Sequence, residues 1–256
     1  MAAAWQYANG RELEGQVALV TGGARNIGRA ISLALADAGA AVAVNTRASR
    51  EDAASVVQQI RDAGGDAESY LADISDAGAV SAMFEAAIRR FGRIDILVLN
   101  ASVRRETRFA DMSFEEWRSI MALTLDGSFH CIKACLPSMR AAGGGHIVTL
   151  GGDSALTGAA TKVHSSAAKC GLIGMTRALA RDLAEYNIRV NCVSPGHINT
   201  TRPAHRPARP DARGLIPLGR WGESDEVAAM VRFLCGPGGA YVTGQTLHVN
   251  GGQTMF

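Results

Sequence analysis

The stretch QVALVTGGARNIGRAISLALADAG, residues 16–39, decides the fold. Its first six residues form an apolar, β-branched run, which predicts a buried strand at 16–21. A glycine-rich turn follows at once, and from residue 26 the apolar side chains recur at helical spacing up to a stop at Gly39. A strand, a glycine turn and a helix in direct succession are typical of the first unit of a doubly wound α/β sheet.

The same alternation continues along the chain. It predicts further strands at 41–45, 66–73, 94–100, 147–150, 188–194 and 246–250, and further helices at 49–64, 79–92, 113–140 and 164–186. Strands that alternate with helices of this length are joined by right-handed parallel crossovers. The sequence therefore predicts the α/β class, as a single-domain, Rossmann-type, doubly wound parallel sheet of seven strands with helices on both faces.

Two segments fall outside this alternation. We predict a flexible N-terminal tail at 1–12, which leaves 13–256 as the domain. The segment NTTRPAHRPARPDARG (199–214) contains three prolines and four arginines. Because proline interrupts both helices and strands, this segment predicts a loop or lid, at about 197–216.

The bulk composition excludes several classes of function. A chain of 256 residues with 47% hydrophobic and 20% charged residues is typical of one soluble globular domain. Its net charge of +2 gives no field that would favour nucleic acid or membrane. The N-terminus lacks the pattern of a secretory signal. The five cysteines have no metal-ligand spacing, so we expect free thiols, a cytoplasmic protein and no metal site.

The glycine-rich turn T21-G22-G23-A24-R25-N26-I27-G28 is a candidate phosphate site. Glycine lets the backbone approach a pyrophosphate, and the N-terminus of the following helix offers free N–H groups to its charge. The alternative is an ordinary tight turn, but the position between a first strand and a helix favours dinucleotide binding. The predicted contacts come from Gly22, Arg25, Asn26, Ile27 and Gly28.

The end of the second strand indicates which dinucleotide binds. Proteins that bind NAD usually have an acidic residue there, whereas NADP-binding proteins have an arginine for the 2′-phosphate. Here the strand ends in V44-N45-T46-R47, and no carboxylate precedes Glu51. Arg47, with Thr46 beside it and Arg25 in the glycine turn, can hold a phosphate through its guanidinium. NADP(H) is favoured over the alternative of two solvated surface arginines.

Several motifs resemble those of the short-chain dehydrogenase/reductase family, in the branch similar to β-ketoacyl-ACP reductases. They are TGGARNIG, LADISD, LNAS at 99–102, RVNCVSPGHINT at 189–200 and the ending VTGQTLHVNGGQTMF, and the resemblance covers about residues 13–256. Asn26 replaces the usual middle glycine, which is tolerable because asparagine adopts positive φ more readily than most residues. The resemblance implies adenine contacts from Asp73 and Ile74, ribose contacts from Asn100 and Ala101, and nicotinamide contacts from Pro195, Gly196, Ile198 and Thr200.

The catalytic positions of the family are mostly changed. The resemblance implies a Tyr-x-x-x-Lys pair, but four residues before Lys169 the chain has Ser165. The family's serine position is Gly152, and its asparagine position is Thr124 in T124-L125-D126-G127. Only the lysine of this tetrad is retained, and we expect it to bind the nicotinamide ribose. A serine hydroxyl is a far weaker acid than tyrosine, and no oxyanion motif supports a nucleophilic Ser–Lys pair.

Other residues are candidates for the missing proton donor. His164 has a suitable pKa range and could be oriented by Asp153, although a surface or core-edge histidine is the alternative. Asp153 and Ser154 follow the fifth strand, where such folds place their chemistry, and Ser154 could bind a substrate oxygen.

Two arginine-rich loops predict an anionic ligand. They are S102-V103-R104-R105-E106-T107-R108 and the lid, with Arg202, Arg206, Arg209 and Arg213, and solvated loop charge is the alternative. The preferred function is an NADP(H)-dependent oxidoreductase that acts on a carbonyl, imine or enoyl group, for example of an acyl thioester. The alternatives are a catalytically silent subunit that supports an active paralogue in a heteromer, and a nucleotide-sensing regulator. The family's dimer and tetramer surfaces predict a homo-oligomer, such as a homotetramer, under either of the first two.

Overall fold

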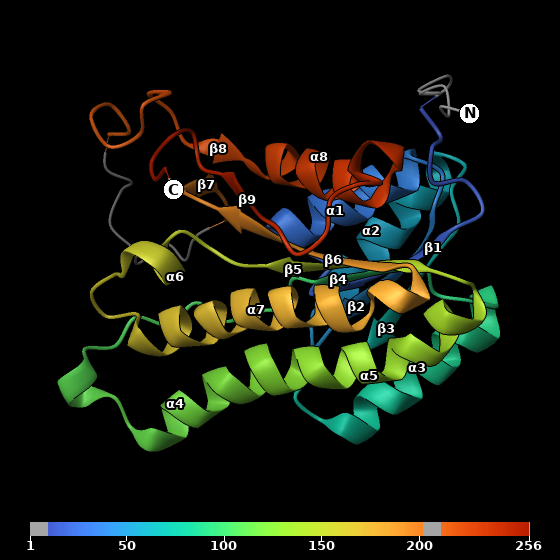
Figure 1. The fold of residues 1–256 in the computed structure, drawn as a ribbon, viewed down its shortest axis with the longest axis horizontal. Helices are drawn as coiled ribbons and strands as arrows, with labels where there is room; N and C mark the ends of the chain where they lie inside the picture. The colour runs from blue at the N-terminus through green and yellow to red at the C-terminus, as the bar shows by residue number, and fades with distance from the viewer. Residues whose placement is uncertain (1–9, 202–210, 256) are drawn as a thin grey trace.

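A computed structural model describes residues 10–201 and 211–255 (Figure 1). The main sheet is parallel, with the strand order β3-β2-β1-β4-β5-β6-β9. Its strands are β1 (Val17–Thr21), β2 (Ala41–Thr46), β3 (Ala67–Leu71), β4 (Ile96–Leu99), β5 (Gly145–Leu150), β6 (Ile188–Pro195) and β9 (Thr246–Val249). All seven predicted strands and the predicted fold class are confirmed.

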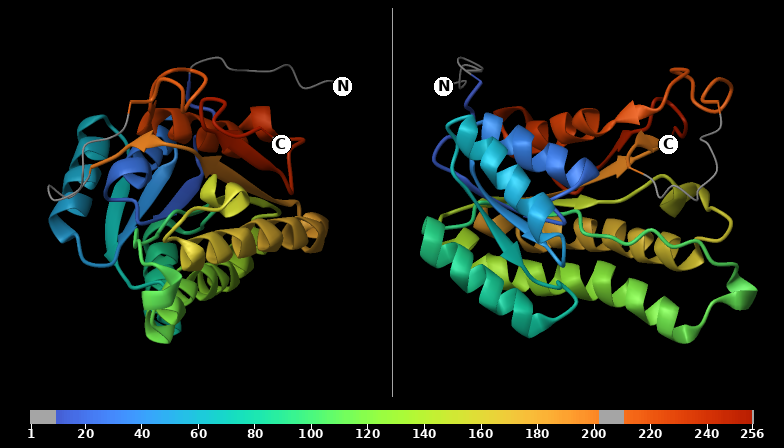
Figure 2. Two further views of the ribbon diagram at one scale, coloured as in Figure 1. Left: turned by 90° about the vertical axis from the view of Figure 1, so that its left-hand side faces the viewer. Right: turned by 180° about the vertical axis from the view of Figure 1, so that it is seen from behind.

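Helices cover both faces of this sheet (Figures 1 and 2). One face carries α1 (Asn26–Asp37), α2 (Arg50–Asp62) and α8 (Ser224–Cys235), and the other carries α3 (Ala77–Phe91), α4 (Phe114–Met121), α5 (Gly127–Ala141) and α7 (Val163–Asp182). In β1, Ala18 and Val20 belong to the first core cluster, whereas Val17 and Leu19 belong to the second. Because both faces are covered, the strand reads as a continuous apolar run.

The strand order places the candidate site. Chain order reverses between β1 and β4, which are hydrogen-bonded neighbours. In such sheets the crevice beyond the carboxyl ends of the strands, at the point of reversal, is where ligands bind. The loops after β1, β2, β4, β5 and β6 all lie at this edge.

The long helices differ from their predicted bounds. The predicted helix at 113–140 is divided into α4 and α5 by a π-helical turn, Ala122–Asp126. The predicted helix at 164–186 ends as α7 at Asp182, and a separate 3₁₀ turn follows at Ala184–Tyr186. A short helix α6 (Ser154–Thr157) follows β5. Helical periodicity alone does not reveal a π turn, because one inserted residue changes the spacing only locally.

The two segments predicted to lie outside the regular elements are only partly described. Residues 1–9 of the predicted tail and 202–210 of the predicted lid, with Arg202, Arg206 and Arg209, lie outside the described residues. Gly10 and Glu12 both accept hydrogen bonds from Arg232 of α8. At the start of the predicted lid, β7 (Ile198–Asn199) pairs with β8 (Gly222–Glu223). None of the described helices is long and apolar enough to cross a membrane.

Candidate functional site

Two adjoining cavities lie beyond the carboxyl ends of the parallel strands. We name them the β2 cavity, of about 670 Å³, and the β5 cavity, of about 550 Å³, after the strands whose ends they border. Ile27, Asn100, Thr200 and the segment 102–104 line both cavities. The two therefore form one cleft, which runs from the end of β2 to the end of β5.

The glycine turn lines the β2 cavity, and two of its residues have left-handed backbone angles. Gly22 has a φ of 61°, and Asn26 has a φ of 49°. The side-chain Oδ1 of Asn26 accepts a hydrogen bond from Thr201 N at 2.8 Å. A Cβ on Gly28 would lie 2.1 Å from the carbonyl oxygen of Gly22, so only glycine fits there. Arg25, the N-cap residue of α1, makes no side-chain capping hydrogen bond, which leaves the first N–H groups of the helix for a ligand.

Basic and acidic side chains face each other across the outer end of this cavity. Arg47 Nη1 lies 3.7 Å from Asp73 Oδ2, and Arg25 Nε lies 3.7 Å from Asp52 Oδ2. Both guanidinium groups are more than 60% exposed, so these ion pairs contribute little and can be exchanged for a ligand. Burial acts to raise the pKa of Asp73, but hydrogen bonds from Ser75 and the nearby Arg47 outweigh it, and the pKa is lowered.

Two asparagines hold the loops that form this cavity. Asn45 Oδ1 accepts a hydrogen bond from Gly22 N at 3.3 Å, and Asn45 Nδ2 donates to the carbonyl of Ala72 at 3.1 Å. Asn100 Nδ2 donates to the carbonyls of Thr21 and Gly22, each at 3.0 Å. Asn45 was not among the residues predicted to form the site. Its only signal was a polar residue in an otherwise apolar buried strand.

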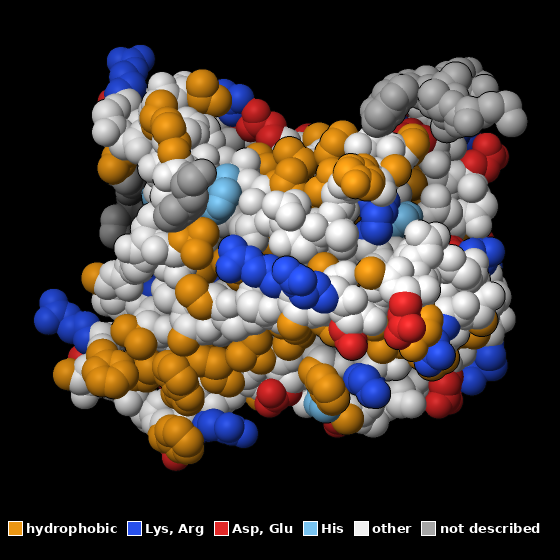
Figure 3. All heavy atoms as spheres, in the orientation of Figure 1, with side chains coloured by type: hydrophobic (Ala, Val, Ile, Leu, Met, Phe, Trp, Pro, Cys, Tyr) orange, Lys and Arg blue, Asp and Glu red, His pale blue; other side chains and the backbone are white. Residues whose placement is uncertain are grey.

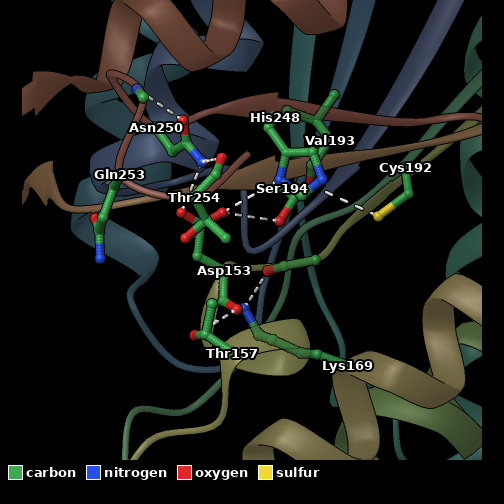
Figure 4. A network of polar contacts seen from close by, with 12 residues as sticks. Asp153, Thr157, Lys169, Cys192, Val193, Ser194, His248, Asn250, Gln253 and Thr254 are labelled. Atoms are coloured by element: carbon green, nitrogen blue, oxygen red, sulfur yellow. Dashed lines mark hydrogen bonds and ion pairs between the residues drawn. The ribbon is translucent and has the colours of Figure 1, made fainter. Parts of the chain in front are cut away.

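Lys169 lies at the inner end of the β5 cavity. It projects from α7, and its Nζ donates a hydrogen bond to the carbonyl of Gly151 at 2.5 Å (Figure 4). Burial lowers the pKa of Lys169 to about 8, and the positive charge of Arg104 contributes in the same direction. A Cβ on Gly152 would lie 3.3 Å from Nζ. The glycine therefore leaves open the space beside the ammonium.

His164 and Ser165 have different environments although they are adjacent. Ser165 lines the β5 cavity, and both its N–H and its hydroxyl contact His164 Nδ1, at 2.7 and 3.3 Å. His164 is fully buried, and its Nε2 lies 3.1 Å from Glu116 Oε1 of α4. The predicted pairing of His164 with Asp153 does not form, because the imidazole turns toward α4 and away from the cleft.

Asp153 is buried beneath the C-terminal segment. Its Oδ2 accepts a hydrogen bond from Asn250 Nδ2 at 2.9 Å, and its Oδ1 lies 3.4 Å from Ser194 Oγ and 3.3 Å from His248 Nδ1. Figure 4 shows the carboxylate directed toward these three residues, away from Lys169. Asp153 therefore joins the end of β5 to β6 and to the segment after β9.

A cluster of three residues in the β5 cavity was not predicted from the sequence. His197, Trp221 and Gln253 all line this cavity. The rings of His197 and Trp221 meet edge-on, with centroids 4.7 Å apart, and His197 Nδ1 is hydrogen-bonded to Gln253 Oε1. These residues come from three separate segments, so no local pattern could bring them together. The available signal was a histidine within the PGHINT motif.

Thr124 lies outside the cleft. It is buried in the π-helical turn and lines neither cavity, and its carbonyl accepts a hydrogen bond from Ser128 Oγ at 2.6 Å. Single π turns occur frequently next to functional sites, which fits the position of this turn between α4 and α5.

Of the two arginine-rich loops predicted to border the site, the loop at 102–108 contributes cations to the β5 cavity. Arg104, Arg105 and Glu106 line the β5 cavity with Lys162, whose Nζ lies 3.5 Å from Glu106 Oε1. In the described part of the predicted lid, Arg213 lines neither cavity.

The other predicted residues can now be placed. Lys169, Ser165, Asp153 and Ser154 line the β5 cavity, whereas His164 and Thr124 do not. Every predicted cofactor-binding residue lines one of the two cavities: Gly22, Arg25, Asn26, Ile27, Gly28, Thr46, Arg47, Asp73, Ile74, Asn100, Ala101 and Thr200 line the β2 cavity, and Lys169, Pro195, Gly196 and Ile198 line the β5 cavity.

Comparisons with known proteins agree with this geometry. Residues 22–254 match the family described as enoyl-(acyl carrier protein) reductase. The chain is 40% identical over 245 residues to a 3-oxoacyl-[acyl-carrier-protein] reductase of Synechocystis, covering 95% of this chain and 99% of the relative. A protein of the same name from Vibrio cholerae is 38% identical, with 95% and 99% covered.

Solved structures give the same result. A dehydrogenase/reductase from Sinorhizobium meliloti superposes with a TM-score of 0.89 at 34% identity, covering 96% of this chain and 98% of that one. A blue fluorescent protein from a metagenomic library, solved in complex with NADPH, gives 0.88 at 35% identity, with 95% and 100% covered. From its sequence, its sheet order and these matches, the chain belongs to the short-chain dehydrogenase/reductase family.

Proposed function

We propose that the protein is an NADP(H)-dependent oxidoreductase that reduces a carbonyl, imine or enoyl group with a proton donor other than tyrosine. The observation that carries the proposal is the single cleft from Arg47 to Lys169, which every predicted cofactor residue lines. When bound, the nicotinamide supplies a hydride, and the chain must orient the acceptor group, exclude water and provide a proton.

The residues of the β2 cavity fit a phosphorylated dinucleotide. Uncapped N–H groups of α1 and the left-handed Gly22 and Asn26 suit a pyrophosphate. Arg25 and Arg47 are exposed cations that can exchange weak ion pairs for a 2′-phosphate. The end of β2 carries no carboxylate for a ribose hydroxyl. The solved NADPH complex of the similar blue fluorescent protein supports the same choice.

At the other end of the cleft, Lys169 is suited to hold the nicotinamide ribose. Its ammonium lies between the Gly151 carbonyl and the cavity, so its remaining protons are available to ribose hydroxyls. Pro195, Gly196 and Ile198 line the same cavity, where they would flank the nicotinamide ring.

The charged residues that line the β5 cavity favour a substrate with an anionic group. Arg104, Arg105 and Lys162 line the β5 cavity, and of the two carboxylates that also line it, Glu106 pairs with Lys162 and Asp153 accepts a hydrogen bond from Asn250. A carboxylate, or the phosphates of an acyl-CoA or of an acyl-carrier phosphopantetheine, would complement this charge. The names of the Synechocystis and Vibrio relatives, which act on 3-oxoacyl groups, support the same class.

A self-associating surface is part of the proposal. Phe114 of α4 and Phe129 of α5 are 69% and 53% exposed, and Figure 3 shows hydrophobic side chains gathered over α4, α5 and α7. Exposed apolar patches of this kind mark protein interfaces. We therefore propose a homo-oligomer that associates through these helices. A Phe114→Asp variant should give a smaller species in sedimentation analysis, and an unchanged mass would remove this part.

The test of function begins with binding. The purified chain should enhance NADPH fluorescence on titration and bind NADH more weakly. It is then screened for NADPH oxidation with acetoacetyl-CoA, crotonyl-CoA and a cyclic imine. Turnover of any of these substrates supports the proposal, whereas absent NADPH binding, or NADPH binding with turnover of none of them, overturns it.

A silent subunit is the second candidate. Ser165 stands at the tyrosine position, and the adjacent His164 is held by Glu116 outside the cleft. NADPH binding without turnover of any probe, together with activation of a co-expressed paralogue, would select this candidate.

A further inference from the structure

We propose that His197 donates the proton to the substrate in the β5 cavity. This inference rests on the proposed reductase function and names the donor that replaces the missing tyrosine.

The backbone places His197 at the cavity by a close-packed turn. β6 ends at Pro195, and Gly196 follows against the C-terminal segment, where an added Cβ would lie 2.6 Å from Asn250 Cβ. Only glycine fits this approach, so the position of the next residue is fixed. The His197 ring is half-buried in the cavity, edge-on to Trp221.

The contacts of the ring determine its tautomer. Nδ1 is hydrogen-bonded to Gln253 Oε1, which can only accept, so Nδ1 carries a proton in both the neutral and the charged ring. Nε2 has no hydrogen-bond partner among the residues that the structure describes. The imidazolium can therefore release the Nε2 proton while its bond to Gln253 is kept, and no group has to reorient.

A hydrogen-bond network that begins at the buried Asp153 holds the turn that carries Gln253, the hydrogen-bond acceptor of His197. Asp153 Oδ2 binds Asn250 Nδ2, Asn250 Oδ1 accepts from Gly252 N at 3.0 Å, and the Asn250 carbonyl accepts from Gln253 N at 3.1 Å. Figure 4 shows Asp153 beneath this C-terminal turn, from which Gln253 projects. Asp153 is thus a positioning residue for Gln253, and through it for His197.

The other candidate donors are already engaged. The Ser165 hydroxyl contacts His164 Nδ1, and Lys169 donates to the Gly151 carbonyl and is suited to the ribose. The other charged groups that line the cavity are Arg104, Arg105, Glu106, Asp153 and Lys162, and the Arg220–Glu226 ion pair lies near the backbone of the same turn. Of the groups that line the cavity, the His197 ring is the one that can release a proton at Nε2 while its hydrogen bond at Nδ1 is kept.

Reduction of a ketone consumes one hydride and one proton. The carbonyl carbon forms a C–H bond with hydride from the reduced nicotinamide, and the C–O π pair moves to oxygen. The oxygen takes the proton from His197 Nε2, which leaves an alcohol and a neutral Nδ1–H ring. Water then returns a proton to Nε2.

The first test needs no substrate. Long-range ¹H–¹⁵N NMR spectra of the free protein should show the neutral His197 ring with Nδ1 protonated and Nε2 unprotonated. In Gln253→Leu this tautomer preference should be lost, whereas Gln245→Leu, at an exposed glutamine outside the cleft, should preserve it. A neutral ring protonated at Nε2 in the parent protein would overturn the proposal.

The second test is kinetic. With the active probe, His197→Gln should lower kcat about 100-fold or more, the usual contribution of a general acid, with NADPH affinity within threefold of the parent. Gln253→Leu should lose about 10-fold in kcat, and Gln253→Glu should restore it.

The outcomes separate the two proposals. If the parent turns over a probe and His197→Gln keeps more than a third of its kcat, this inference is wrong and the proposed function stands. If the parent oxidises NADPH with none of the probes, the proposed function fails, and the inference fails with it.

Discussion

Replacing Arg47 with alanine should weaken NADPH binding about 5- to 30-fold and leave NADH binding within threefold. A guanidinium–phosphate hydrogen bond contributes about 1.5–3 kcal/mol. Against this stands the ion pair to Asp73, at 3.7 Å with Arg47 62% exposed, which binding gives up at a cost of about 0–1 kcal/mol. The difference spans about 0.5–3 kcal/mol, and the middle of that range, about 1–2 kcal/mol, corresponds to the stated change in affinity, since 1.4 kcal/mol is tenfold.

The assay is fluorescence titration of both nucleotides at two salt concentrations. The matched control is Arg50→Ala, because Arg50 is exposed at the start of α2 and lines neither cavity. The effect of Arg47→Ala should shrink at high salt, where the phosphate is screened in the parent protein too. Equal losses for NADPH and NADH, or the same loss in Arg50→Ala, would refute a 2′-phosphate contact at Arg47.

Three further predictions follow from the cleft. Because the pKa of Lys169 is lowered to about 8, its side chain should lose its proton as the pH rises through 8. Labelling of Lys169 by an amine reagent, read by mass spectrometry, should therefore increase in this pH range and be slowed by NADPH. Labelling that increases only near pH 10.5 would contradict this prediction. His164→Ala should lower the free energy of unfolding in urea by about 1–3 kcal/mol, because it removes the buried partner of Glu116, and should leave the NADPH dissociation constant unchanged. Gly28→Ala should lower stability by about 1–3 kcal/mol and abolish NADPH binding, because its Cβ would meet the Gly22 carbonyl at 2.1 Å; binding that survives would show that the turn can relax.

The sequence predicted the sheet well because the determinants of the sheet are local. β1 contributes to both core clusters, and its apolar run is readable without any partner strand. The residues that line the cleft were predictable for a related reason. A glycine turn binds phosphate mainly through backbone atoms, so a short motif carries most of the information. Asn26, with its positive φ, is an example in which residue type and backbone agree.

The catalytic side was less predictable because its contacts are non-local. The bond between His197 and Gln253 spans 56 residues of sequence, and that between Asp153 and Asn250 spans 97. The direction of His164 depends on Glu116 in another helix, 48 residues away. The sequence around His164 could not show that its imidazole turns toward α4. Such side-chain directions are decided by packing between elements.

If the proton donor of the β5 cavity has been replaced while Lys169 is kept, the family's serine and tyrosine should still function when they are restored. In Gly152→Ser with Ser165→Tyr, a phenol enters the β5 cavity beside Lys169, and the new Cβ at position 152, 3.3 Å from Nζ, requires only a small shift of a flexible ammonium. A tyrosine with its pKa lowered by the neighbouring ammonium is a competent acid. The double variant should reduce acetoacetyl-CoA about 10-fold faster or more, and adding His197→Gln to it should then cost less than threefold. If His197→Gln still removes activity from the double variant, the histidine acts on the structure of the cavity and not on the proton.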